Sequence, residues 1–272
     1  MAQTSNGWFS FPVLSLVIVL VVASWFSPPV LPAPYNHNKH AESDAGRGAS
    51  DHAQAPTKSP QWEGSAEGKA YSEFSHQICA LCVLLIGFGE LRSSLGGRGR
   101  DWAMYLLPGA LIAAGMWLLI WSDHDAWPVG HMSFLDTFVQ ATGEIAQHKQ
   151  YGLLALGVGA IELARRREVL QAPGWLFPLP LFAIVGGLML FSHDHGPHPA
   201  AQHIAMHHAL MGSAAVAAGI AKTLAGLKAV RQLGPRAGVG LEGVGPRNIS
   251  WWDLTWSLLV LVIAVQLLLY RE

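Results

Sequence analysis

The sequence predicts an all-α protein, a polytopic bundle of about seven transmembrane helices in which a helix pair is repeated. Hydrophobic residues make up 51% of the 272 residues and charged residues only 13%. An ordinary soluble domain carries about 25% charged residues. In addition, apolar segments long enough to cross a bilayer, about 20 residues each, recur along the chain.

The same composition excludes several classes of protein. A net charge of -1 offers no field that would attract a nucleic acid, and we expect no such partner. Two cysteines are too few for a disulfide framework, and the high apolar content excludes a disordered chain. The lipid bilayer is therefore the expected environment.

Seven apolar segments are candidate spans, and tryptophans mark many of their ends. They are Trp8–Phe26, Phe74–Leu91, Trp102–Trp121, Tyr151–Leu163, Trp175–Phe191, His203–Leu224 and Trp251–Tyr270. The fourth is short unless its helix starts near Gln147. The first is predicted to be a retained anchor, because no Lys or Arg precedes it; a cleaved signal peptide would leave six spans.

Lys and Arg predict the orientation, because they gather in the loops after the second, fourth and sixth spans. These loops are expected to be cytoplasmic, in a bacterial inner membrane, with the N-terminus inside and the C-terminus outside. The predicted parts are an anchor or signal (1–26), a disordered His-containing extracytoplasmic linker (27–73), a five-helix repeat core (74–224), a cytoplasmic Gly/Pro-rich loop (225–250) and a last transmembrane helix (251–272).

The repeat is visible in the spacing of three residue types. Each copy has a His, a Gly eleven residues later, and a charged residue three positions further on. The copies are His76, Gly87 and Glu90; His148, Gly159 and Glu162; and His208, Gly219 and Lys222. The intervening spans also correspond, since Leu118–Asp125 reads LLIWSDHD and Leu188–His195 reads LMLFSHDH.

Each repeat copy ends in a charged residue, for which two roles are possible. These residues are Glu90, Glu162 and Lys222. They are expected to form salt bridges or to extend toward the membrane surface. The alternative is an exit site for a cation on the cytoplasmic side.

All 13 histidines fall on the predicted outer side, many of them beside aspartate or methionine. Imidazole and thioether together suit copper, whereas zinc would also accept His and Asp. The aspartates either bind the metal directly or orient a ligating His. The candidate ligands are Asp123, His124, Asp125, His131, His193, Asp194, His195, His198, His203, Met206, His207, His208 and Met211.

The repeat histidines, His76, His148 and His208, lie at membrane depth, where ionisable residues are usually functional. They are candidate axial ligands of haem b, copper ligands, steps of an ion path, or polar residues at the interface. Cys79 and Cys82 follow His76 at steps of three. They are expected to be small buried apolar residues, with Cu(I) binding as the alternative.

These His-led helices, the LLIWSDHD and LMLFSHDHGPH loops and the His/Met start of the sixth span resemble the bacterial copper-resistance D (CopD) family over about residues 74–224. The resemblance implies copper resistance, movement of copper across or into the inner membrane, and a periplasmic copper-binding protein as partner. Seven spans depart from the family's commoner eight, and no copper-binding β-sandwich domain is fused to the chain.

The leading hypothesis is a non-enzymatic membrane protein that binds copper at its periplasmic face and supports copper uptake, homeostasis or resistance. One alternative is a membrane b-type cytochrome with histidine axial ligands. The other is an accessory subunit whose outer loops dock a partner.

Overall fold

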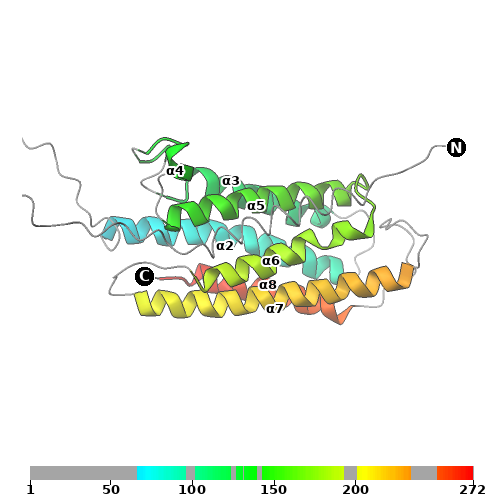
Figure 1. The fold of residues 1–272 in the computed structure, drawn as a ribbon. Coiled ribbons are helices and arrows are strands. Elements are labelled where there is room, and N and C mark those ends of the chain that lie inside the picture. The colour runs from blue at the N-terminus through cyan, green and yellow to red at the C-terminus, as the bar shows by residue number, and fades with distance from the viewer. Residues whose placement is uncertain are drawn as a thin grey trace, which may run out of the picture.

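The computed structural model describes residues 66–95, 102–123, 127–130, 132–139, 143–192, 201–233 and 250–271. All regular elements in these ranges are helical, as predicted, and the long helices form an antiparallel bundle (Figure 1). In chain order they are α2 (Ala66–Ser94), η2 (Trp102–Tyr105), α3 (Leu106–Ile120), α4 (Asp136–Val139), α5 (Gly143–Arg166), η3 (Pro173–Leu176), α6 (Pro178–Leu190), α7 (Ala201–Leu233) and α8 (Trp251–Leu268). The predicted first span lies outside the described residues.

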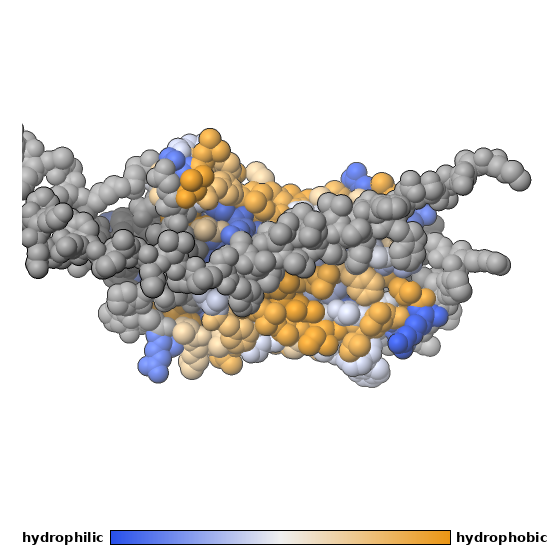
Figure 2. All heavy atoms as spheres, in the orientation of Figure 1, coloured by the Kyte–Doolittle hydropathy of each residue, from blue (hydrophilic) through white to orange (hydrophobic). Residues whose placement is uncertain are grey.

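Five described helical segments are long and apolar enough to cross a membrane. They are Ala66–Ser94, Trp102–Ile120, Pro173–Leu190, Gln202–Arg231 and Trp251–Leu268. Hydrophobic residues cover the middle of the visible face, and the most hydrophilic ones lie mostly toward the two ends (Figure 2). The described part of the chain therefore has the architecture of a multi-pass membrane protein.

Helices α2, α5 and α7 extend beyond their predicted limits. Helix α2 starts at Ala66, so residues 66–73 are helical and not part of a linker. Good helix formers and an acidic residue in the first turn, Glu67, favour this earlier start. Helix α7 continues to Leu233, into the predicted loop.

The fourth predicted span is the apolar middle of a longer helix with polar ends. Helix α5 has 24 residues and starts at Gly143, before the Gln147 that the sequence suggested. It is not among the five apolar segments, but it packs along α3 inside the bundle.

The antiparallel arrangement gives the bundle two chemically different ends. Helices α2, α5 and α7 begin where α3, α6 and α8 finish (Figure 1). We call this the histidine end, because His76, His148 and His208 lie there. We call the opposite end, where Glu90 and Arg166 meet, the ion-pair end.

Glycines allow two helix pairs to approach closely. A Cβ added to Gly115 of α3 would lie 2.8 Å from the backbone oxygen of Gly152 in α5. A Cβ added to Gly212 of α7 would lie 2.6 Å from the backbone oxygen of Gly187 in α6. Small residues at helix interfaces permit this backbone contact in membranes, where packing drives helix association.

The two contacts are equivalent in the repeat. One heptad beyond Gly152 and Gly212 come Gly159 and Gly219, which meet Ile112 of α3 and Ile184 of α6 respectively. Each isoleucine precedes the close-contact glycine of its own helix by three residues. The α3/α5 and α6/α7 pairs therefore pack with the same register, which supports the repeat seen in the sequence.

The remaining repeat copy, on α2, pairs with helix α8. Helix α8 packs along α2, and a Cβ on Gly87 would lie 2.8 Å from the Leu261 side chain. At the positions equivalent to the glycine contact stand Ala80 and Ala264, both fully buried. The described bundle thus contains three similar helix pairs, one of which joins helices distant in sequence.

We expect Gly212→Ala to destabilise the bundle by about 1–3 kcal/mol, because its new methyl group overlaps the α6 backbone. The matched control is Gly157→Ala, whose Cβ would meet nothing within 4 Å. Thermal unfolding in detergent measures both changes. Equal midpoints for the two variants would contradict the close α6/α7 contact.

Candidate functional site

Three aromatic side chains from three helices meet at the histidine end. The ring centroids of His76 on α2 and His208 on α7 lie 6.5 Å apart, with an angle of 28° between their planes. Tyr270, just after α8, stacks on His76 at 4.0 Å and lies parallel to His208 at 6.2 Å. His208 is 2% exposed and Tyr270 is fully buried. His76 is half-buried. We call these three residues the buried cluster, after His208 and Tyr270.

The His76 ring is held in one tautomer. Its Nδ1 lies 2.8 Å from the backbone oxygen of Ser72, one helical turn earlier. A carbonyl oxygen accepts hydrogen bonds, so Nδ1 carries the proton and donates it. The lone pair of the neutral ring is then at Nε2, the arrangement in which a metal-ligating histidine is usually held.

A second pair of histidines lies on the exposed face at the start of α7. His203 and His207, four residues apart, bring their Nε2 atoms to 3.3 Å of each other. Met206 is exposed on the same turns, whereas Met211 is buried. The ring of His207 also meets Tyr270 edge-on at 6.1 Å. We call His203 and His207 the exposed pair.

The third repeat histidine lies in a separate cluster between α3 and α5. Its Nδ1 is 2.8 Å from the Asp123 carboxylate, which is only 7% exposed. Lys149, almost fully buried, donates to the backbone oxygen of Leu119 at 2.7 Å and lies 3.8 Å from the other Asp123 oxygen. His148 is therefore an ion-pair partner here, apart from the buried cluster.

The surroundings of Asp123 favour its charged form. Burial alone would raise the pKa of this carboxyl group. The charge and hydrogen bond of His148, the hydrogen bond from Ser122 and the charge of Lys149 outweigh burial and hold the pKa below its ordinary value.

This pKa shift predicts a pH dependence of stability. Because the folded-state pKa lies below the unfolded value of about 3.9, the carboxylate stabilises the fold above about pH 4 and loses this effect as the pH falls through the folded-state pKa. We expect Asp123→Asn to be less stable than the parent at pH 7 and the difference to shrink on acidification. Thermal unfolding across pH tests this, and a constant difference would contradict it.

Several predicted ligands lie outside the described residues and stay predictions. They are His124, Asp125, His131, His193, Asp194, His195 and His198. Within the described ranges, no group of three or more His, Cys, Asp or Glu side chains is placed to hold a metal ion. The described candidates instead form the buried cluster, the exposed pair and the Asp123 cluster.

The two cysteines are free thiols. Cys82 packs against the hydrophobic core formed by residues such as Ile86 and Leu107. Cys79 and Cys82 were expected to be buried apolar residues, but both are only half-buried.

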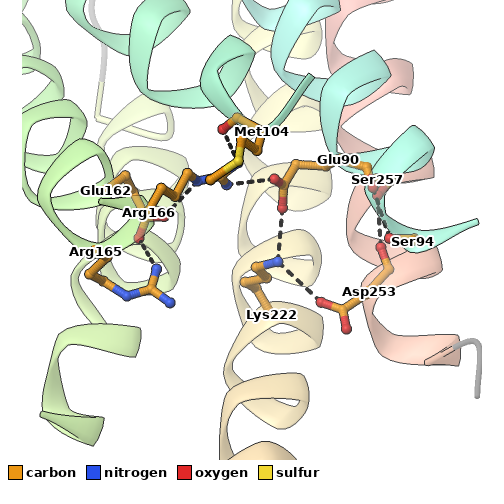
Figure 3. Close-up of polar contacts among 9 residues, drawn as sticks. All are labelled: Glu90, Ser94, Met104, Glu162, Arg165, Arg166, Lys222, Asp253 and Ser257. Carbon is orange, nitrogen blue, oxygen red and sulfur yellow. Dashed lines mark hydrogen bonds and ion pairs between the residues drawn. The ribbon is translucent and has the colours of Figure 1, made fainter. Parts of the chain in front are cut away.

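The charged residues that close the repeat copies form one network at the ion-pair end (Figure 3). Glu90 of α2 accepts from Arg166 of α5 at 2.7 Å and from Lys222 of α7 at 2.8 Å. Lys222 also contacts Asp253 of α8 at 3.1 Å. Figure 3 shows Glu90 at the centre of this chain.

The network continues along α5 and is balanced in charge. Glu162 is 2.6 Å from Arg165 and 3.6 Å from Arg166, and Arg166 also donates to the backbone oxygen of Met104. Three carboxylates thus face three cationic side chains. This pairing supports the salt-bridge reading of Glu90, Glu162 and Lys222 over a cation exit site, because the carboxylate charges are already compensated.

We expect Glu90→Gln to destabilise the fold by about 3 kcal/mol, because it removes the buried carboxylate that two partly buried cations share. Asp253→Asn is the matched control. Its side chain is 34% exposed, so we expect a loss below about 1 kcal/mol. Thermal unfolding distinguishes the two, and a similar loss in both variants would refute the central place of Glu90.

Sequence reasoning missed three residues of the histidine end. Tyr270 was the end of a predicted span, where an aromatic side chain is ordinary. Lys149 stands beside a repeat histidine but was not singled out. Tyr71 donates to the backbone oxygen of Trp121 at 2.5 Å and joins α2 to the end of α3.

Comparison with protein-family models, with curated proteins and with solved structures finds no match to this chain.

Proposed function

We propose that this protein is a multi-span membrane protein that binds copper at its histidine end and supports copper uptake, homeostasis or resistance. The observation that carries the proposal is the exposed pair, His203 and His207. Two imidazole nitrogens about 2.0–2.1 Å from one tetrahedral ion lie about 3.3–3.4 Å apart. The two Nε2 atoms are 3.3 Å apart, so small ring rotations would let both bind one ion.

The neighbouring residue types favour copper over other metals. Met206 is exposed three residues after His203, on the same face of α7. A thioether is a soft ligand that suits Cu(I), whereas zinc sites use His, Cys, Asp and Glu. The resemblance to the copper-resistance D family supports the same metal.

The distribution of charge supports a periplasmic histidine end in a bacterial inner membrane. Arg165, Arg166 and Lys222 lie at the ion-pair end, and positively charged residues favour the cytoplasmic side. Copper would then reach the exposed pair from the periplasm, delivered as the free ion or by a periplasmic copper-binding protein.

The repeat histidines also bear on the cytochrome alternative. Only His76 and His208 come close together, with their ring centroids 6.5 Å apart, while His148 pairs with Asp123. A haem b would therefore use His76 and His208 as axial ligands, with Tyr270 against both rings.

The test is the metal content of the detergent-purified protein from copper-supplemented cells. We expect near-stoichiometric copper, lowered by the double substitution His203→Ala and His207→Ala because the pair supplies two ligands. Gln202→Ala, an exposed change on the same turn, is the control and should keep the parent's copper content.

Other outcomes point to the alternatives. Iron in place of copper, with a Soret band that shifts on reduction, would support the cytochrome. Neither metal would refute copper binding and favour the accessory subunit. Copper retained in full by the double variant would remove the exposed pair from the proposal.

A further inference from the structure

We infer that the segment around helix α4 is an interfacial membrane anchor, inserted among the lipid headgroups at the histidine end. We call residues 127–130 and 132–139 the α4 segment, which lies between α3 and α5 in the chain. Such an anchor is independent of the metal that the protein holds, and so goes beyond the proposed function. Three features of the segment support it: its exposed apolar side chains, its placement beside the bundle and the tryptophans next to it.

The α4 segment turns its apolar side chains outward. Leu135 and Val139 are 74% and 82% exposed. Phe134 and Phe138 are exposed as well. Residues four apart share one side of a helix, so these four side chains form a continuous outward surface. Thr137 is fully buried and donates to the backbone oxygen of Phe134 at 2.5 Å. In water, a stable turn would bury the apolar groups and expose the polar one.

Local contacts hold this surface in one arrangement. The ring of Phe134 meets the rings of Trp127 and Phe138 edge-to-face, with centroids 6.2 Å and 5.3 Å apart. The Ser133 hydroxyl donates to the Asp136 carboxylate at 2.6 Å and accepts from the Asp136 backbone N–H at 3.2 Å. Aromatic pairs and side-chain bonds to the backbone both favour an ordered turn. The apolar surface is therefore a formed feature of the fold.

The segment projects sideways from the bundle and not along its axis. In Figure 1, α4 lies beside the start of α5, which it contacts, whereas the start of α2 reaches farther out at the histidine end. Hydrophobic residues form the outer edge of this projection in Figure 2. Around a bundle that spans a bilayer, a sideways projection lies over the surrounding lipid and not over the helix ends.

Aromatic side chains next to the segment mark the level of the headgroups. Trp121 closes α3, is exposed and stacks on Trp117 with ring centroids 5.7 Å apart. Phe74 of α2 meets the same Trp117 ring edge-on at 5.8 Å. Tryptophan gathers at the border between hydrocarbon and headgroups, because its ring has an apolar body and a polar N–H. Trp127, at the start of the α4 segment, continues this aromatic belt outward.

Lipid fits this surface better than a soluble partner does. A partner from the aqueous side would meet the helix ends, whereas the α4 segment points into the space that lipid fills. Interfacial segments bury their apolar side about 5–10 Å into the boundary between headgroups and acyl chains. Because the segment follows Asp123 in the chain and contacts α5, which carries His148, its insertion would hold the Asp123 cluster at the membrane surface.

The experiment measures how deep single side chains lie in a bilayer. Cys79→Ala with Cys82→Ala removes both native thiols, and Leu135→Cys or Val139→Cys then carries an environment-sensitive fluorophore. The bilayer is phosphatidylethanolamine and phosphatidylglycerol, with added lipid that is spin-labelled either near the headgroup or near the end of the acyl chain. At both positions we expect quenching at least about twofold stronger from the shallow spin label, given the depth of interfacial segments.

Two matched positions calibrate the depth. Leu258 is exposed near the middle of α8, so a fluorophore on Leu258→Cys should be quenched most by the deep spin label. Ala66 is exposed at the start of α2, so a fluorophore on Ala66→Cys should be quenched by aqueous iodide and little by either lipid. The Leu258 position also reports that the bundle is inserted.

Three results would overturn the anchor. Iodide quenching at Leu135 and Val139 that equals the quenching at Ala66 would place the segment in water. Fluorophores shielded from both iodide and lipid would show that protein, such as a second copy of the chain, covers the surface. Quenching dominated by the deep spin label, as at Leu258, would place the segment within the hydrocarbon.

Discussion

The neutral charge network at the ion-pair end fixes how the helices stand relative to one another. Isolated charges in a low-dielectric interior are costly, so each must find an opposite charge within reach. Glu90 satisfies this requirement for Arg166 and Lys222, which come from two other helices, and Lys222 extends the chain to Asp253 of α8. Sliding α2 by one turn, about 5.4 Å, would separate Glu90 from both Arg166 and Lys222. The register of four helices is thus set at one end by charge.

The glycine contacts carry this register along the bundle to the histidine end. Gly115 meets Gly152, and Gly187 meets Gly212, in the half of each helix nearer the histidine end. Because these backbones touch, the helices have little freedom to rotate or slide. The positions of His76, His208 and Tyr270, at the far end, therefore follow from contacts made elsewhere.

The sequence predicted the kinds of element and the residues that mark the repeat, but not which helices are neighbours. Hydropathy and the spacing of His76, His148 and His208 were sufficient for the helical class and for the shared end of these residues. The same spacing made the three histidines look equivalent. The structure separates them, because His148 faces Asp123 whereas the other two face Tyr270. Spacing within a helix does not contain this information, since it depends on the partner helix. The contacts of Glu90 with Lys222, and of Tyr270 with His76, join residues far apart in the chain, which no local pattern predicts.

The pairing of α2 with α8 has a consequence for how the protein is made. Synthesis proceeds from the N-terminus, so the α3/α5 and α6/α7 pairs can form while the chain is still growing. Helix α2 can pack on α3 early, but until α8 is made its Gly87 face lacks Leu261 and His76 lacks Tyr270. Helix α8 adds a residue to each end of the bundle, because Asp253 pairs with Lys222 and Tyr270, just after the helix, packs beside His208. A ribosome that stalls before α8 would therefore release a chain in which the α8-facing side of α2 is uncovered. Membrane quality control could recognise that chain by the uncovered side of α2, which carries Gly87 and His76.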